Sequence, residues 1–230
     1  MFYPMMDWTM IVLLPAILLA VWAQNKVKST FEQYSRVRSR RGITGREAAR
    51  AILTSYGLGS MPIKPIAGQL TDHYDPQSRS LSLSEPVYDS TSIAAIGVAA
   101  HEVGHAVQHA TGYKPLALRN SIVPVVNLTN MASWPLFLMG LIAGNSRLMN
   151  IGILLFVGVV LFHLVTLPVE LDASRRALKV LSSNGMMDGE EVTGARKVLG
   201  AAAMTYVAAL VQSVLQLVRL LLLRNSRSRD

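Results

Sequence analysis

Four long apolar stretches constrain this 230-residue chain more than any other feature of its sequence. They cover residues 8–23, 122–143, 148–167 and 204–223. A helix needs about 20 apolar residues to cross a bilayer, and the hydrocarbon offers no partner for an open backbone. We therefore expect a mainly α-helical integral membrane protein with about four transmembrane helices. The fourth stretch carries a polar stripe on one helix face, formed by Gln212, Gln216 and Arg219. It therefore either spans the membrane or lies in its interface.

The basic residues predict how the chain is oriented. Lys and Arg number 12 in residues 24–120 and 5 in residues 171–202, but none in residues 1–7 and one in residues 144–147. Basic loops stay on the cytoplasmic side, which places the N-terminus outside and both basic segments in the cytoplasm. The basic tail after residue 223 conflicts with a fourth crossing. Because this topology explains the net charge of +8, we do not expect a nucleic-acid partner.

The segment 24–120 is expected to form a small α+β part. A capping box at residues 44–47 predicts a helix that ends at Gly57 or Gly59. Residues 61–88 change to Pro- and Gly-rich sequence, and Leu81–Ser84 alternates apolar with polar residues, as a half-buried strand does. We expect two or three strands here, with Leu81–Ser84 either an edge strand that can pair with an extended peptide or ordinary sheet core.

The sequence HExxH lies within the apolar segment 93–112, which contains no Asp, Glu, Lys or Arg other than Glu102. On a helix, His101 and His105 lie on one face, where both imidazoles can reach a single Zn²⁺. Glu102 lies beside that face, where it can act as a general base on a water. The chain has no cysteine, so thiolate ligands are excluded. The pattern predicts one catalytic zinc per chain.

A catalytic zinc takes three protein ligands, so a third is needed. His109 is eight residues from His101, which is about 12 Å along a helix, so these two residues and His105 cannot reach one metal. Glu170 is the better candidate. It follows Pro168 at the start of an expected separate helix over 169–183, and two crossings separate it from His105. Both residues then lie on the same side of the membrane.

Four segments carry a resemblance to a known family: LTDHYDP at 70–76, LSLS at 81–84, AAHEVGHAVQ at 99–108 and LPVELDASRRA at 167–177. Together they resemble the YugP-type family of bacterial membrane zinc metallopeptidases. The family is distantly similar to the CaaX-protease type of gluzincin, in which a Glu on a later helix is the third ligand. The resemblance implies a zincin-like cytoplasmic part, with His101, His105 and Glu170 as ligands and Glu102 as base. The whole chain, 1–230, is then one membrane-embedded metallopeptidase domain.

The chain departs from the CaaX-protease pattern at one position. That pattern has an Asp four residues after the ligand Glu, where it orients a ligand histidine, whereas this chain has Ser174. Either Ser174 or Asp172 is a candidate for that role. His73 and Tyr74 are candidates for stabilising the oxyanion, because a zinc peptidase needs a donor there. For His109 three positions are possible: it supports a metal ligand, it faces the substrate, or it lies on the protein surface.

These features predict a membrane-bound zinc endopeptidase of the bacterial inner membrane that cleaves membrane-proximal protein segments. Membrane lipid is an expected partner, while a homo-oligomer or a membrane-protein partner stays open. One alternative is an intramembrane protease whose HExxH helix crosses the bilayer, with Asp172 as third ligand. Others are a zinc transporter and a non-catalytic scaffold stabilised by zinc. The intact Glu102 argues against the scaffold, because a purely structural site has no use for a base.

Overall fold

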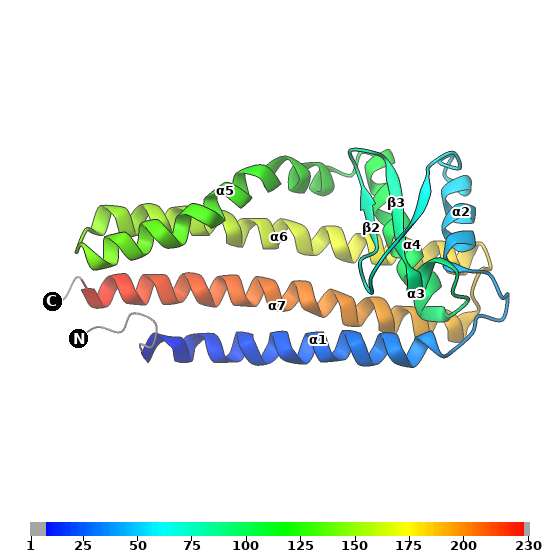
Figure 1. The fold of residues 1–230 in the computed structure, drawn as a ribbon, viewed down its shortest axis with the longest axis horizontal. Helices are drawn as coiled ribbons and strands as arrows, with labels where there is room; N and C mark the ends of the chain where they lie inside the picture. The colour runs from blue at the N-terminus through cyan, green and yellow to red at the C-terminus, as the bar shows by residue number, and fades with distance from the viewer. Residues whose placement is uncertain (1–7, 228–230) are drawn as a thin grey trace. The chain divides into compact units, whose positions relative to one another are not determined.

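The computed structural model describes residues 8–227 and is built mainly from helices (Figure 1). Its internal contacts divide the described chain into two compact units. The apolar unit comprises residues 8–23, Leu118–Leu167 and 205–227. The polar unit comprises Gln24–Ala117 and Pro168–Met204. Each unit is described separately below.

Four helices in the described chain are long and apolar enough to cross a membrane, in agreement with the four apolar stretches. The first is a 3₁₀ turn, η1 (Trp8–Leu13), that leads directly into α1 (Leu14–Ser35). The others are α5 (Lys114–Ile142), α6 (Ser146–Ser183) and α7 (Gly189–Arg227). Helices α1, α6 and α7 continue past the ends of their apolar stretches, whereas α5 begins eight residues before its stretch and ends within it.

The apolar unit buries some large side chains and exposes others. Phe137, Phe156 and Leu220 form part of its interior, whereas Leu128 and Leu154 are largely exposed. Exposed leucines on long apolar helices are expected where the surrounding medium is hydrocarbon.

The polar stripe on α7 is partly explained within the apolar unit. Arg219 is buried, and its Nε donates a hydrogen bond to the Thr9 hydroxyl at 3.1 Å. Its guanidinium also lies 5.8 Å from the ring centroid of Trp134. Arg219 therefore faces other helices of the unit, as a charged side chain on an apolar helix is expected to do.

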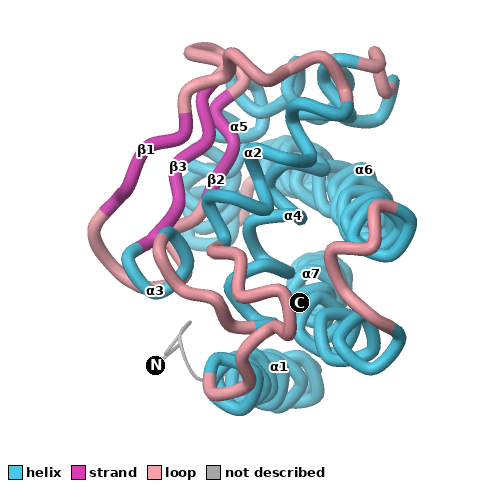
Figure 2. The backbone as a smooth tube through the Cα atoms, turned by 90° about the vertical axis from the view of Figure 1, so that its right-hand side faces the viewer, coloured by secondary structure: helices cyan, strands magenta, loops and turns pink. Residues whose placement is uncertain are grey.

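The polar unit contains the predicted sheet and the HExxH helix. Strands β1 (Ile63–Ile66), β2 (His73–Asp75) and β3 (Ser80–Ser84) form a three-stranded sheet in the order β1-β3-β2 (Figure 2). Strand β3 is parallel to β1 and antiparallel to β2. The segment Leu81–Ser84 is thus the sheet core rather than an edge. Both Leu81 and Leu83 are fully buried.

Three helices pack in the polar unit with this sheet. They are α2 (Gly45–Ser55), the short α3 (Glu85–Tyr88) and α4 (Ile93–Ala110). The predicted capping box begins α2, because the Glu47 N–H donates to the Thr44 hydroxyl and the Thr44 N–H donates to the Glu47 carboxylate. Ser92 caps α4. Residues Ile96, Ala99 and Val103 of α4 are fully buried in the core.

The expected start of a separate helix after Pro168 is wrong. Helix α6 continues through Pro168 without interruption to Ser183. Proline removes a single backbone donor, and within a long apolar helix local hydroxyl groups and packing can compensate for that loss. The carbonyl that loses its donor is that of Leu164, four residues before the proline, while the nearby Thr166 hydroxyl donates to the carbonyl of Phe162 at 2.8 Å. Glu170 is therefore in a helix interior, so its position is not explained by a helix N-terminus.

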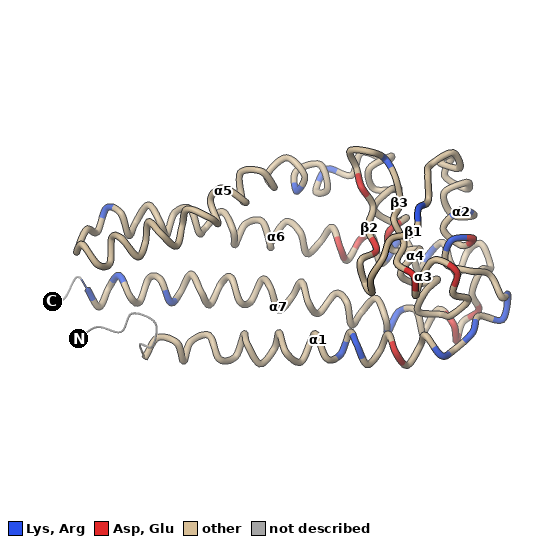
Figure 3. The backbone as a smooth tube through the Cα atoms, in the orientation of Figure 1, with Lys and Arg blue, Asp and Glu red and all other residues tan. Residues whose placement is uncertain are grey.

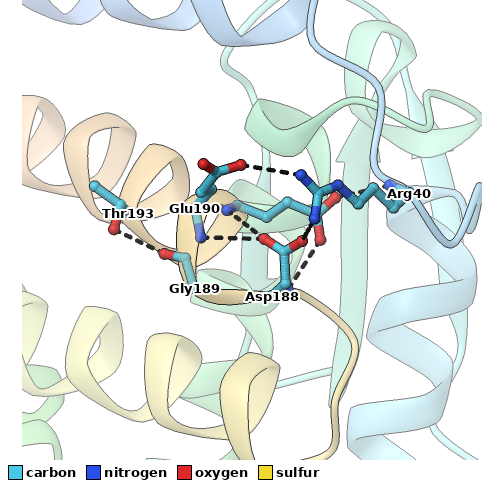
Figure 4. Close-up of polar contacts among 6 residues, drawn as sticks. Arg40, Asp188, Gly189, Glu190 and Thr193 are labelled. Atoms are coloured by element: carbon cyan, nitrogen blue, oxygen red, sulfur yellow. Dashed lines mark hydrogen bonds and ion pairs between the residues drawn. The ribbon is translucent and has the colours of Figure 1, made fainter.

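Lys, Arg, Asp and Glu residues gather in the polar unit, whereas the helix segments of the apolar unit carry few of them (Figure 3). One group holds the first turn of α7 (Figure 4). Arg40 forms ion pairs with Asp188 and Glu190, and its backbone N–H donates to Glu191 at 2.7 Å. Asp188 and Glu191 also exchange hydrogen bonds as a capping box. The chain between α1 and α2 is thereby fixed to the start of α7.

Candidate metal centre

Helix α4 places two imidazoles toward one carboxylate of α6. The Nε2 atoms of His101 and His105 each lie 3.4 Å from the same oxygen, Oε2 of Glu170. One potential ligand atom from each of the three residues lies within 4.8 Å of the others. Within residues 8–227 this is the one group of His, Cys, Asp or Glu side chains found at such distances. The structure therefore brings together the three residues that the sequence analysis selected.

The geometry of this group fits a zinc ion. Ligand atoms about 2.0–2.2 Å from a tetrahedral zinc are separated from one another by about 3.4 Å. The two nitrogen-to-oxygen distances match this separation. The donor set of two imidazoles and one carboxylate is also one that catalytic zinc uses. The side chains of His101, His105 and Glu170 are 14%, 10% and 3% exposed, so the group lies largely out of water.

A glycine allows α4 and α6 to approach each other at this point. A Cβ atom added to Gly104 would lie 2.6 Å from the backbone oxygen of Ala173 and 3.1 Å from its Cα atom. Such distances are shorter than van der Waals contact, and rigid backbone cannot yield easily. Gly104 is thus required for the close packing that brings Glu170 to the histidines.

The remaining ring nitrogens of the two histidines have partners of their own. Nδ1 of His101 lies 3.0 Å from the Ser174 hydroxyl, and Nδ1 of His105 lies 3.0 Å from Oε1 of Gln108. When Nδ1–H donates these bonds, Nε2 keeps its lone pair for a metal. Ser174 thus contacts a candidate ligand directly, in the position where the CaaX-protease pattern has an acid.

Gln108 connects the second histidine to α6, and the sequence analysis did not identify it. Its side chain is fully buried, and its Nε2 donates to the carbonyl of Val169 at 2.8 Å and to Asp172 at 2.9 Å. Asp172 in turn accepts a hydrogen bond from Arg176 at 2.6 Å. Asp172 therefore lies outside the three-residue group and acts through Gln108. The signal available in the sequence was an amide three residues after His105 on an apolar helix, where it needs partners.

Glu102 lies beside the group, and its carboxylate has a backbone partner. Oε2 accepts a hydrogen bond from the N–H of Tyr74 in β2 at 3.1 Å. Burial raises the pKa of Glu102, and the two neighbouring histidines only partly oppose this effect. A raised carboxyl pKa suits a group that must accept and release a proton near neutral pH.

The candidate ligands influence one another's charge. Burial raises the pKa of Glu170, but its interactions with His101 and His105 outweigh burial and hold the pKa well below its usual range. Burial lowers the pKa of His105, yet Glu170 and Glu102 reverse this and raise it. The carboxylate is therefore ionised, which is the state that binds a metal.

The other candidate residues lie outside the three-residue group. His73 is exposed, and its Nδ1 lies 2.8 Å from the carbonyl of Thr71. The Tyr74 hydroxyl lies 2.7 Å from Nδ1 of His109, so these two side chains pair with each other. This pairing could not be predicted from local sequence, because the two residues are 35 positions apart. It gives His109 a partner on β2.

Comparisons with known proteins place the chain in a family. The family described as "Putative neutral zinc metallopeptidase" matches residues 9–225. The chain is also 50% identical over 208 residues to the "Putative membrane protease YugP" of Bacillus subtilis (strain 168), covering 90% of this chain and 92% of that protein. No solved structure matches the chain. The chain belongs to this zinc metallopeptidase family, in agreement with the resemblance seen in its sequence.

Proposed function

We propose that this protein is a membrane-bound zinc endopeptidase in which Glu102 is the general base. The observation that carries the proposal is the convergence of the His101 and His105 Nε2 atoms on one oxygen of Glu170, with Glu102 adjacent in sequence. Family membership and the name of the Bacillus relative support the same class of enzyme. Helix α4, which carries the HExxH sequence, is not one of the four helices of residues 8–227 that are both long and apolar enough to cross a membrane.

Each residue of the centre has a defined task in this proposal. His101, His105 and Glu170 hold the zinc, while Ser174 and Gln108 fix the orientation of the two imidazoles. Zinc, when bound, polarises the scissile carbonyl and lowers the pKa of a water. Glu102 accepts a proton from the attacking water and passes it to the leaving amine nitrogen. The Tyr74 N–H holds the Glu102 carboxylate in place before it reacts.

The substrates we propose are protein segments close to the membrane, on the cytoplasmic side of a bacterial inner membrane. Glu170 is three residues beyond the apolar stretch 148–167 on the continuous helix α6, which corresponds to about 4.5 Å along the helix axis. The basic residues of the polar unit support its cytoplasmic placement through the positive-inside rule.

The proposal is tested with detergent-purified protein, comparing wild type with Glu102→Gln. Both should hold about one zinc per chain, because Glu102 is not a ligand. Only wild type should cleave an unfolded protein or co-expressed membrane protein, and the variant should lose activity by about 10²–10⁴-fold. His105→Gln and Glu170→Gln should lose zinc as well as activity.

Two results would overturn the proposal in different ways. If wild type and Glu102→Gln both retain zinc and neither cleaves any substrate, the centre is structural or belongs to zinc transport. If wild type and Glu102→Gln cleave at the same rate, another residue is the base. Zinc retention by Glu170→Gln at the wild-type level would exclude Glu170 from the ligand set.

A further inference from the structure

A groove of ≈ 670 Å³ runs between α6 and α7 within the polar unit. The two helices run beside each other here, and the loop 184–188 joins them (Figure 1). The groove is lined by residues from Leu171 to Ser183 on α6 and from Val192 to Ala203 on α7. The proposed catalytic mechanism uses none of its volume.

Three cations surround this groove. Arg175 and Lys179 come from α6 and Arg196 from α7, and all three are exposed. None of them forms an ion pair in the described part of the chain, and Asp172 pairs with Arg176 instead. Three positive charges around one groove repel one another, so an anion placed among them would be stabilised.

The floor of the groove is apolar. Leu178 and Leu199 line it, and Gly200 leaves open space, because a Cβ atom added there would meet nothing within 4 Å. An occupant that complements this surface therefore carries both a negative group and a hydrocarbon part.

The groove begins close to the apolar stretches of both helices. On α6, Leu171 lies four residues beyond residue 167, and on α7, Ala203 immediately precedes the stretch 204–223. Arg175 is about 12 Å beyond residue 167 along the helix, and side chains on a helix lean toward its N-terminus, which here is the apolar end of α6. The cations of α6 thus lean toward the level where lipid headgroups lie.

We propose that this groove is a binding site for an anionic phospholipid. The lipid phosphate lies among Arg175, Lys179 and Arg196, and an acyl chain follows the apolar floor past Leu199. Basic pockets between transmembrane helices are known to bind anionic headgroups such as that of cardiolipin. Charge complementarity selects this occupant over a zwitterionic lipid.

One residue, Ser174, belongs both to the groove and to the surroundings of the candidate metal centre. Ser174 lines the groove, and its hydroxyl contacts Nδ1 of His101, the ring nitrogen other than the one facing Glu170. A lipid bound in the groove would therefore contact Ser174, which supports a candidate ligand. Its binding is measured directly, without any protease assay.

Native mass spectrometry of the full-length protein tests the proposal, with cardiolipin, phosphatidylglycerol and phosphatidylcholine as probes. Wild type should retain one anionic lipid at a detergent concentration that strips phosphatidylcholine. Because each cation near a membrane contributes roughly fivefold to the attraction of anionic lipid, R175Q/K179Q/R196Q should weaken binding by about 100-fold. Its zinc content should equal that of wild type.

A matched control and a second kind of variant sharpen the test. K26Q/K28Q/R36Q removes three exposed cations of the segment that follows the first apolar stretch, none of which lines the groove, and should bind lipid within about twofold of wild type. Gly200→Leu keeps every charge but fills the groove, and the open space at Gly200 lets the helix accept the larger side chain. It should also lose the lipid.

Several results would overturn the proposal. Equal losses in the groove variant and in K26Q/K28Q/R36Q would show diffuse attraction to a basic surface rather than a site. Retention of lipid by both the groove variant and Gly200→Leu would place the lipid elsewhere. Equal retention of phosphatidylcholine would exclude headgroup charge, and displacement by inorganic phosphate alone would identify a small anion instead of a lipid. A dimer that dissociates in the groove variant, with lipid retained, would identify a second copy as the occupant.

Discussion

The polar and apolar units use glycine in the same way but for different purposes. In the polar unit, Gly104 lets α4 approach α6, and the contact assembles a group of titratable side chains. In the apolar unit, Gly152 lets α6 approach α5, since an added Cβ would lie 2.8 Å from the backbone oxygen of Ser133. The second contact packs two helices against each other, and the atoms nearest to Gly152 belong to Phe137 and Ser133, neither of which is titratable.

The difference follows from the medium around each unit. In water, burying apolar side chains drives packing, and the polar unit has a core of fully buried residues. In hydrocarbon there is no such driving force between helices, so close contact through small residues matters more. We therefore expect substitutions in the polar unit to reduce zinc binding, whereas substitutions in the apolar unit reduce only the stability of the protein.

Gly104→Ala should have the largest effect. The added methyl group would meet the backbone of Ala173, so α4 and α6 must separate, and overpacking of this kind costs about 1–3 kcal/mol or more. Zinc content and activity should both be lost. Gly97→Ala on the same helix is the control, because its Cβ would lie 3.4 Å from the Ala195 side chain, at ordinary contact distance. Zinc retained by Gly104→Ala would show that this approach does not set the ligand geometry.

Gln108→Leu should weaken zinc binding by about 10–100-fold, the usual effect of removing an outer partner of a ligand histidine. The substitution removes the acceptor for His105 and leaves Asp172 without its amide donor. Zinc affinity measured by chelator competition checks this, with Thr111→Val as control, because that hydroxyl bonds only backbone carbonyls. Ser174→Ala should have a similar effect through His101. Unchanged affinities would mean that the imidazoles are oriented by packing alone.

Gly152→Ala should reduce stability by about 1–3 kcal/mol while zinc content stays at the wild-type level. The added Cβ would crowd the backbone and Cβ of Phe137 as well as Ser133. Gly158→Ala, also on α6, meets its nearest atom only at 3.7 Å and should be neutral. Thermal unfolding in detergent, followed beside zinc content, measures both properties. Loss of zinc in Gly152→Ala would mean that the two units are energetically coupled.

Arg40→Gln should have the smallest effect, about 0–1 kcal/mol, and high salt should reduce it further. Its partners Asp188 and Glu190 are partly or largely exposed, so water screens these ion pairs. Glu191→Ala should cost more, because Glu191 is buried and accepts bonds from two backbone N–H groups. Urea unfolding of the zinc-loaded protein compares them. Equal effects would show that the exposed ion pairs contribute as much as the buried cap to holding the start of α7.

Local rules predicted much of this fold from the sequence. The lengths of the apolar stretches predicted four long helices, and helix periodicity predicted that His101 and His105 share one face. Turn residues predicted a small sheet around Leu81–Ser84, which the structure contains. Counting crossings brought Glu170 to the same side as the histidines, and the structure places it beside them. Their roles as zinc ligands stay predictions, which the zinc measurements above test.

Local rules failed where the result depended on contacts between distant segments. Pro168 is a usual helix boundary, but the apolar helix around it continued. Gln108 gained its meaning only when α6 supplied Val169 and Asp172 as partners. Helix periodicity showed which face of α4 carries Gly104 but not which backbone would lie against it.

The burial of the three candidate ligands has a consequence for the rate of metal exchange. Glu170 is only 3% exposed and His105 10%, so a chelating agent could approach a bound ion only at the position left open for substrate, and it could displace the protein ligands only after these side chains move. We expect loss of zinc to wait for a local opening of the packed helices, at a rate that stops rising once the chelator is in excess. Brief treatment with such an agent would then leave the zinc content unchanged, even though prolonged exposure removes the metal.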